Sequence, residues 1–534
     1  MRSLKRARIQ LTVEDWLATG LIAAFFLFNL IGLDRVPFAN ADEAWIAEPG
    51  LHYWLHGTFA SSLHAGFFGT ERHYLIHAPL FSLITGWMIW IFGPGLVQLR
   101  LVSLTMATVT AALTYRLGRV LLSPRHGLLA TVFLTWWRSG PYQWEARQSG
   151  IILVDFARLA RYDIAVPFFG VIGVLLILPW LLRRDIGGWR FALAGVMAGL
   201  ATACHPLGLL CLATLVMLCL GSSPGRAMAP MVWMFAGFGV AMLPLVVFVY
   251  AGWDDAMGQQ QLQHGRWGFG DPWFYAWNML REWRRYISVG RGLQFGIPGA
   301  WLFVGCSVWG GVLLLRRRQP LILAALMTGF ILLALCEREK FFFYLAALWP
   351  WIALAVAMGF VSATQATSRI VRVAAMVLLA LACLDGVRAE VVLAREAAAR
   401  APYADICNRL KATIPRDARV LALPTWWIGL APHVRDYRSL TVPMFFLQPH
   451  LIDPAGPTFT QRLAAIDADV LLFDQAMIDY VHGPRAAWAV EQGPGTRNPG
   501  AEELEQFVAT HAKRRVDVTD PAYGRFEVYF LRER

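Results

Sequence analysis

The sequence predicts a mainly helical membrane protein, with a polytopic transmembrane helical bundle of about 11 spans and a C-terminal α/β domain outside the membrane. Three observations indicate this fold class. Of the 534 residues, 57% are hydrophobic and only 16% are charged, whereas an average soluble domain has roughly 25% charged residues. Apolar runs close to the roughly 20 residues that cross a bilayer alternate with polar segments. From about residue 389 onward, the composition changes to that of an ordinary globular domain.

The expected spans follow one another along the first part of the chain. The first, 16–33, comes after four basic residues between positions 2 and 8 and is not followed by a small-residue cleavage site, so we expect a retained helix with a cytoplasmic N-terminus. The connections that this topology makes cytoplasmic are short and rich in arginine. An odd number of spans then places the C-terminus on the periplasmic side. The further apolar runs are approximately 98–122, 126–144, 164–182, 190–204, 206–221, 227–250, 297–315, 320–336, 341–362 and 370–387.

Two domains follow from this pattern, a transmembrane domain over 1–388 and a soluble periplasmic domain over 389–534. Residues 34–97 form a long first periplasmic loop, in which 78–92 is apolar but short and is typical of a helix lying in the outer interface. The second domain alternates β-rich runs with helical patterns, which predicts an α/β fold. Its expected elements are strands at 419–424, 469–474 and 526–531 and helices at 403–413 and 459–466.

Charge and cysteine content exclude several classes of protein. The net charge of +12 is explained by basic cytoplasmic loops, and the basic residues form no stripe interleaved with aromatics, so we expect no nucleic-acid partner. Six of the seven cysteines lie within or at the ends of apolar runs, and no paired spacing occurs, so neither a disulfide framework nor a zinc finger is expected. Glycine-rich phosphate loops, nucleophile triads and dinucleotide fingerprints are absent from the sequence.

Acidic residues lie beside two of the spans, at the outer membrane surface. Asp42 and Glu43 come soon after the first span, and Asp163 directly precedes the fourth. Acids at the mouth of one bundle can converge on a single pocket, where a carboxylate accepts the proton of an attacking hydroxyl, a role worth typically 10²–10⁴-fold in rate. The alternative is that these carboxylates are solvated or cap helices, with Asp42 capping a helix over 43–56.

Cationic residues are expected at the same outer face. His77 opens the interfacial helix, Arg100 begins the second span, His205 lies at the outer break of a helix pair, and Arg338 and Lys340 precede an aromatic run. Such side chains bind a phosphate and stabilise the negative charge that develops as the phosphate leaves. The alternative for each is snorkelling or pairing with a nearby acid.

A third group raises the question of a metal. Glu48, His52 and His56 share one helical face at spacings of four residues, which is compatible with a divalent cation. No partner motif such as HExxH accompanies them, so an interfacial helix with polar side chains facing water is the favoured interpretation. We therefore expect no certain cofactor and keep a divalent metal open, with these three residues as its weak candidates.

The acidic and cationic motifs, taken in their order along the chain, resemble those of the GT-C membrane glycosyltransferases. The likeness is to the bacterial branch related to protein O-mannosyltransferases and the lipid A aminoarabinose transferase. The resemblance covers about residues 10–365. Each motif alone is too variable to identify a family, so the resemblance depends on finding all of them in the same order along the chain. His77 and His205 depart from the lysines usual at these places. The matching pieces are Asp42-Glu43, His77-Ala78-Pro79-Leu80, Arg100-Leu101-Val102-Ser103, Ala157 through Asp163, Gly199-Leu200-Ala201 running into His205-Pro206-Leu207-Gly208, and Lys340 through Tyr344 to Pro350.

The resemblance implies transfer of a sugar from a polyprenyl-phosphate donor to an acceptor hydroxyl on the periplasmic face of a bacterial inner membrane, with inversion. It makes Asp42 the expected general base and Asp163 a second acid that positions acceptor or sugar. Arg100, His77, His205 and Lys340 would hold the leaving lipid phosphate. A histidine is only partly charged near pH 7, so contacts of His77 and His205 with the donor phosphate would differ from those of a lysine. This difference bears on the identity of the substrate more than on the class of reaction.

Two further readings remain at the level of sequence. One is transfer of a whole glycan chain, as by a ligase or polymerase; the other is a transporter or flippase of lipid-linked sugar. A transporter places ionisable residues near the bilayer midplane and often has inverted repeats, whereas here most charges fall at helix ends and in external loops. The expected partners are a polyprenyl-phosphate sugar, membrane lipids and a glycan, lipid or protein acceptor. The sequence leaves the sugar, the choice of acceptor, the prenyl length and the oligomeric state open.

Overall fold

The computed structural model describes residues 11–138, 149–222, 224–263, 271–287, 298–448, 450–451, 453, 455–484 and 497–532. The basic residues between positions 2 and 8 and the end of the expected span 126–144 lie outside these ranges. Each of the expected apolar runs contains a helix. The helices of the bundle are α1 (Val13–Leu30), α4 (Leu96–Leu121), α5 (Pro124–Trp136), α7 (Ala165–Leu181), α8 (Gly188–Cys204), α9 (Leu209–Ser222), α10 (Met228–Ala251), α14 (Pro298–Arg316), α15 (Pro320–Cys336), α16 (Trp349–Thr364) and α17 (Arg369–Ala399).

Within the described residues, seven helical segments are long and apolar enough to cross a membrane, and α8, α9 and α15 belong to shorter apolar helices. The chain is therefore a multi-pass membrane protein with a helical bundle, as predicted. The number of spans stays a prediction, because the shorter helices do not meet the length of a full span on their own. Packing inside the bundle is uneven: α16 is almost entirely buried, while α10 exposes most of its apolar surface.

Short helices lie between the spans. The predicted interfacial helix is α3 (Pro79–Phe92), which begins with a proline at its first position as proline's fixed φ favours. It packs against α2 (Ala41–His56). A Cβ on Gly50 would overlap the backbone carbonyl of Ser82, so only glycine allows α2 and α3 to cross this closely. The other short elements are α6 (Ile152–Ala157), η1 (Tyr162–Ile164), η2 (Pro206–Gly208), η3 (Pro224–Arg226), α11 (Trp253–Gln260), η4 (Gln261–Gln263), α12 (Pro272–Leu280), α13 (Arg284–Ile287) and η5 (Phe342–Leu348).

The C-terminal part, from Tyr403 to Phe530 and called the sheet domain below, has the predicted α/β fold. Its five-stranded sheet has the order β2-β1-β3-β5-β4, in which β1 is parallel to β2 and β3 while β5 is antiparallel to β3 and β4. The predicted strands correspond to β1, β3 and β5, and the predicted helices correspond to α18 and α21. Its elements are α18 (Tyr403–Thr413), β1 (Arg419–Ala422), η6 (Pro424–Trp426), α19 (Trp427–Leu430), β2 (Asp436–Ser439), α20 (Thr441–Phe445), α21 (Phe459–Ala465), β3 (Val470–Phe473), α22 (Gln475–His482), α24 (Ala501–His511), β4 (Arg514–Asp520) and β5 (Gly524–Phe530).

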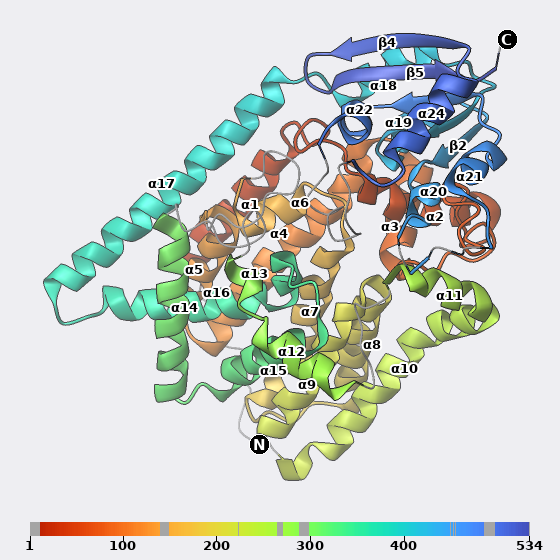
Figure 1. Ribbon diagram of the computed structural model, residues 1–534. Helices are drawn as coiled ribbons and strands as arrows, with labels where there is room; N and C mark the ends of the chain where they lie inside the picture. Colours follow the sequence, from red (N-terminus) through yellow and green to blue (C-terminus); the bar gives the residue numbers. More distant parts are fainter. Residues whose placement is uncertain are drawn as a thin grey trace.

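The expected first external loop, residues 34–97, connects the bundle to this sheet. Figure 1 shows the sheet domain at one end of the molecule, with α2 and α3 beside it and α17 rising along the bundle toward it. One apolar core contains residues of both parts, among them Ala44 and Ala47 of α2 together with Tyr403 and Trp426. The backbone also joins them, because the N–H of Ser439 donates to the carbonyl of Leu63 at 2.9 Å. The start of α2 is thus held by the bundle on one side and by the sheet domain on the other.

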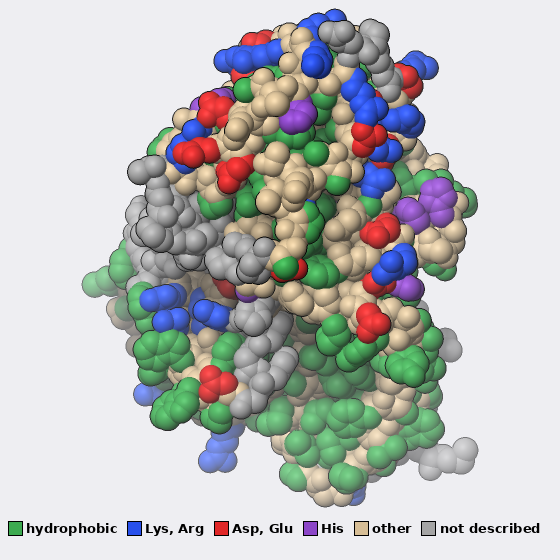
Figure 2. Space-filling model, turned by 45° about the vertical axis from the view of Figure 1, so that its right-hand side comes forward, with side chains coloured by type: hydrophobic (Ala, Val, Ile, Leu, Met, Phe, Trp, Pro, Cys, Tyr) green, Lys and Arg blue, Asp and Glu red, His purple; other side chains and the backbone are tan. Residues whose placement is uncertain are grey.

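The distribution of surface charge agrees with a membrane-embedded bundle. In Figure 2, lysine, arginine and acidic side chains gather on the sheet domain, whereas the lower part of the same face is mostly hydrophobic. Large exposed apolar side chains on α10 include Val240, Val246 and Val247. Apolar surface of this extent is compatible with lipid and not with water.

Candidate functional site

The carboxylates of Asp42 and Asp163 meet on the guanidinium group of Arg161. Nη1 of Arg161 donates to Oδ2 of Asp42 at 2.9 Å, and Nε donates to Oδ2 of Asp163 at 3.0 Å. Asp163 and Arg161 are buried, while the side chain of Asp42 keeps 29% of its surface exposed. One cation therefore joins two acids that come from distant parts of the chain, and we call Asp42, Arg161 and Asp163 the bridged acid pair.

Local sequence explains how Asp42 reaches this position. Asn40 caps α2: its side chain accepts a hydrogen bond from the N–H of Asp42 at 2.9 Å, and the carboxylate of Glu43 accepts one from the N–H of Asn40 at 2.9 Å. Asn40, and not Asp42, is thus the cap of the predicted helix. Asp42 lies in the first turn, where the helix dipole stabilises a negative charge.

Asp163 lies in η1, directly before α7. Its Oδ1 is buried and has no hydrogen-bond partner among the residues that the structure describes, and Nε2 of His205 is 4.0 Å away. A buried carboxylate oxygen without a partner is costly. This oxygen is therefore an available acceptor for a ligand hydroxyl or a water.

Glu43 and Arg100 form a second, fully buried pair behind the bridged acid pair. Nε and Nη2 of Arg100 each donate to the carboxylate of Glu43 at 2.7 Å. The remaining N–H groups of Arg100 donate to three backbone carbonyls, those of Leu33, Pro37 and Phe38, at 2.8–3.0 Å. Both side chains are 0% exposed. All five N–H groups of the guanidinium are therefore used inside the protein, and we infer that this pair supports the loop before α2 instead of contacting a substrate.

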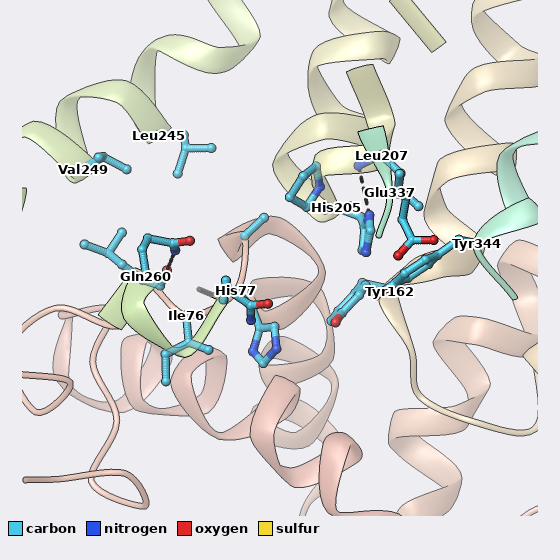
Figure 3. Close-up of a pocket in the computed structure, with 15 residues that line it drawn as sticks. Ile76, His77, Tyr162, His205, Leu207, Leu245, Val249, Gln260, Glu337 and Tyr344 are labelled. Carbon is cyan, nitrogen blue, oxygen red and sulfur yellow. Dashed lines mark hydrogen bonds between the residues drawn. The ribbon is translucent and has the colours of Figure 1, made fainter. Parts of the chain in front are cut away.

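His77 and His205 line one cavity of about 230 Å³ together with two tyrosines. Figure 3 shows His77, Tyr162, His205 and Tyr344 projecting into the same space, with Glu337 beside them. The rings follow one another in contact: the centroids of His77 and Tyr162 are 5.5 Å apart, those of Tyr162 and His205 4.8 Å, and those of His205 and Tyr344 5.7 Å. Because Nε2 of His205, which lines this cavity, is 4.0 Å from Oδ1 of Asp163, the cavity adjoins the bridged acid pair.

The break between α8 and α9 fixes the imidazole of His205. His205 has extended backbone and Pro206 begins η2, so the chain cannot continue as one helix. Nδ1 of His205 accepts the N–H of Leu207 at 3.0 Å. The proton of the neutral ring is thus on Nε2, the nitrogen nearer Asp163. On the opposite wall, Nδ1 of His77 is 2.8 Å from the hydroxyl of Tyr74.

Lys340 lies close to this cavity but is engaged by an acid. Its Nζ is 3.0 Å from the carboxylate of Glu282 and donates to the carbonyl of Ala334 at 2.7 Å. Arg285 joins the same network, since it pairs with both Glu282 and Glu337. Burial lowers the pKa of Lys340 and raises the pKa of Glu337. Arg338, the other predicted cation of this segment, is exposed.

The three metal candidates do not converge. Glu48 is buried and its carboxylate accepts hydrogen bonds from the hydroxyl and N–H groups of the loop residues Ser61 and Ser62, and this burial raises the pKa of Glu48. His52 and His56 lie on the outer side of α2, with ring centroids 4.6 Å apart. Glu48 faces the protein interior, so the three side chains do not share one water-facing surface, and a divalent metal at these residues stays an open expectation. Among the described residues, no group of three His, Cys, Asp or Glu side chains is placed to hold a metal ion.

Sequence reasoning missed Arg161, Tyr162 and Tyr344 as site residues. All three lie inside segments that carried the family resemblance, so a signal was present. The sequence did not indicate which arginine pairs with Asp42 and Asp163, because either Arg100 or Arg161 could have faced these acids.

Comparison with known proteins supports the fold. No protein-family model and no curated protein matches the chain. Solved structures do match. ArnT from Cupriavidus metallidurans in the apo state has 10% sequence identity and a TM-score of 0.58, over 97% of this chain and 98% of that chain. The same protein bound to undecaprenyl phosphate has 11% identity and a TM-score of 0.56, again over 97% and 98%. The apo oligosaccharyltransferase from Archaeoglobus fulgidus has 13% identity and a TM-score of 0.56, over 95% of this chain and 74% of that chain.

At these identities the likeness concerns the fold. The chain has the GT-C membrane fold, as the sequence resemblance over residues 10–365 predicted, and the structural match extends over almost the entire chain. A shared fold does not define the chemistry, which depends on the residues of the site.

Proposed function

We propose that this protein is an integral membrane glycosyltransferase that moves a sugar from a polyprenyl-phosphate donor to an acceptor hydroxyl with inversion, at the periplasmic face of a bacterial inner membrane. The observation that carries the proposal is the bridged acid pair beside the cavity that His77 and His205 line. Structures of the same fold add support, since they include ArnT bound to undecaprenyl phosphate and an archaeal oligosaccharyltransferase in complex with a dolichol-phosphate.

In the proposed reaction, Asp42 is the general base. Its partly exposed carboxylate removes the proton of the acceptor hydroxyl, the hydroxyl oxygen forms a bond to the anomeric carbon, and the bond between that carbon and the phosphate oxygen breaks. The products are the glycosylated acceptor, the polyprenyl phosphate monoester and protonated Asp42, which returns its proton to the phosphate or to water. Arg161 holds the carboxylate in place during attack.

The charge of the bridged acid pair suits this step. Two carboxylates and one guanidinium carry a formal charge of −1 in total, and they are largely shielded from water. Positive charge develops on the sugar ring as the glycosidic bond breaks, so a fixed negative group beside it stabilises the transition state. The Oδ1 of Asp163, which has no hydrogen-bond partner within the described part of the chain, is proposed to accept a hydrogen bond from a sugar hydroxyl and orient the ring.

The leaving phosphate is proposed to lie against His77 and His205. Nε2 of His205 carries a proton in the neutral ring and donates to a phosphate oxygen, and protonation adds a positive charge where the phosphate gains negative charge. Tyr162 and Tyr344 also line this cavity, and their hydroxyl groups can donate hydrogen bonds to the phosphate. Leu245 and Val249 of α10 form the lipid-side wall, along which the first prenyl units would lie.

An assay with purified protein tests the proposal against its alternatives. The protein in vesicles is incubated with undecaprenyl-phosphate-linked, radiolabelled hexoses and pentoses and with cell-envelope acceptors. We expect label to appear in the acceptor and undecaprenyl phosphate to be released in equal amount. Movement of intact lipid-linked sugar across the vesicle membrane, without cleavage of the bond to phosphate, would instead identify a flippase.

A further inference from the structure

A second, larger cavity of about 650 Å³ lies between the first external loop and the sheet domain. It is distinct from the cavity around His77 and His205, with which it shares no lining residue. One wall comes from the loop before α2, and the other comes from η6, the start of α22 and the turn between β4 and β5. The described residues that line it are Pro37, Phe38, Ala39, Asn40, Ala41, Leu159, Leu423, Thr425, Trp426, Asp474, Gln475, Ala476, Asp479, Pro521, Ala522, Tyr523 and Gly524.

The second cavity is next to the bridged acid pair along the chain. Asn40 and Ala41 line the second cavity, and Asp42 is the next residue of the same helical turn. Leu159 also lines it, two residues before Arg161. On the other side, Tyr162 lines the first cavity. The proposed base Asp42 thus directly follows two residues that line the cavity at the sheet domain, while its partners Arg161 and Asp163 flank a residue that lines the cavity at α10.

The lining of the second cavity combines aromatic rings with hydrogen-bond acceptors. The rings of Phe38 and Tyr523 are in contact at 5.0 Å, and Trp426 packs against Tyr523 at 5.6 Å. Asp474 and Asp479 contribute carboxylates, and Asn40 and Gln475 contribute amides. Both oxygens of Asp474 already accept hydrogen bonds, from Nε1 of Trp426 and the N–H of Met477, so Asp479 is the exposed carboxylate that a ligand can reach. Carboxylates and amides accept hydrogen bonds from hydroxyl groups, while aromatic rings offer apolar faces with fixed geometry.

The charge of this cavity selects among acceptors. None of its described lining residues is a lysine, arginine or histidine, whereas two are carboxylates. A phosphate group prefers arginine and lysine, which are absent from the described lining, and the exposed carboxylate of Asp479 would repel it. The lining therefore suits a neutral molecule rich in hydroxyl groups and disfavours an acceptor that carries phosphate at this position.

We propose that the cavity between the first external loop and the sheet domain is the acceptor subsite, and that it binds a neutral oligosaccharide. The inference rests on the proposed function and deepens it, because it chooses a glycan acceptor over a phosphorylated lipid or a protein segment. The acceptor end that reacts would enter past Asn40 and Ala41 to reach Asp42, while the remaining sugar units occupy the space beside Trp426 and Tyr523.

Variants that fill or alter the cavity test this assignment. Ala476 is exposed at the start of α22 and lines the cavity, so Ala476→Trp places a large ring in the space without disturbing a core. Asp479→Ala removes an exposed carboxylate from the same wall. Ala509→Trp is the matched control, because Ala509 is exposed on α24 and does not line the cavity. All proteins are full length, in detergent, with their unfolding midpoints measured for comparison.

Binding is measured by saturation-transfer NMR with neutral hexasaccharides of glucose, mannose and galactose, and with their terminally phosphorylated counterparts. We expect the unaltered protein and Ala509→Trp to bind at least one neutral hexasaccharide, and to bind its phosphorylated form more weakly. Ala476→Trp and Asp479→Ala should each weaken that binding by about tenfold or more, the effect of losing a charge-assisted contact or the space for one sugar unit.

A parallel measurement of undecaprenyl phosphate binding separates the two claims. If the unaltered protein does not bind undecaprenyl phosphate, the proposed function fails. If it does bind, the inference is overturned by any of three results: no neutral hexasaccharide binds, Ala476→Trp binds as well as Ala509→Trp, or the phosphorylated sugar binds more tightly than the neutral one.

Discussion

The buried pair of Glu43 and Arg100 tests whether Arg100 stabilises the fold or binds the donor phosphate. Arg100→Met keeps most of the side-chain volume and removes five N–H donors. The carboxylate of Glu43 would then stay in a site with 0% exposure, with the N–H groups of Asn40 and Ala160 as its remaining described donors. Removing one partner of a buried ion pair costs about 3–5 kcal/mol, and the three carbonyls that Arg100 bonds would also lose their donor.

We therefore expect Arg100→Met to lower the free energy of unfolding by about 3–5 kcal/mol. Glu43→Gln should cost less, because the guanidinium keeps the carbonyls of Leu33, Pro37 and Phe38. In the double variant both charges are gone, so its loss should be smaller than the sum of the single losses by about 0.5–3 kcal/mol.

The assay is denaturant unfolding in detergent, followed by tryptophan fluorescence, with undecaprenyl phosphate binding measured on each folded variant. A structural pair predicts a large loss of stability and nearly unchanged affinity for undecaprenyl phosphate once the protein is folded. The reasoning would be refuted if Arg100→Met kept the stability of the unaltered protein and lost lipid-phosphate binding, since Arg100 would then act on the donor.

Three further predictions concern the site and its surroundings. Arg161→Gln removes the cation that holds Asp42 and Asp163 together, so the rate of undecaprenyl phosphate release with transfer should fall by about 10²-fold as the base loses its position; an unchanged rate would contradict the bridge. His205→Phe keeps an aromatic ring but removes both nitrogen atoms, and should weaken undecaprenyl phosphate binding by about tenfold or more, which tryptophan-quenching titrations would check. The unfolding midpoint should also fall, because the N–H of Leu207 loses its acceptor. Burial holds the pKa of His64 well below its usual 6.5, so the folded protein resists a proton that the unfolded chain accepts, and stability should fall as the pH drops below about 6.5. Unfolding midpoints at pH 7.5 and 5.5 would show a smaller acid loss in His64→Gln, and an equal loss in both proteins would count against this origin.

Much of the fold could be predicted because its cause is local. Apolar runs of sufficient length form the helices of the bundle wherever they occur, and the strand patterns at 419–424, 469–474 and 526–531 alternate or cluster as buried strands do. The proximity of Asp42 and Asp163 was also within reach, because the sequence placed each next to a span at the same outer face.

Other features of the site depend on tertiary contacts that no local pattern encodes. Arg100 and Arg161 both lie near the ends of apolar runs in the sequence, and only packing decides that one pairs with Glu43 while the other joins two acids. Glu48 shares a helical face with His52 in sequence, yet the loop at Ser61 folds back to bind its carboxylate. Helical periodicity indicates which residues share a direction, and it does not indicate what lies in that direction.

The central claim is that the carboxylate of Asp42 removes the proton of the acceptor, and one measurement tests it most directly. The rate of undecaprenyl phosphate release with transfer is compared among the unaltered protein, Asp42→Asn and Asp254→Asn, an exposed carboxylate of α11 that serves as the control. We expect Asp42→Asn to lose about 10²–10⁴-fold in rate while binding undecaprenyl phosphate as before, and Asp254→Asn to keep its rate. Transfer by Asp42→Asn at the rate of the unaltered protein would contradict the account.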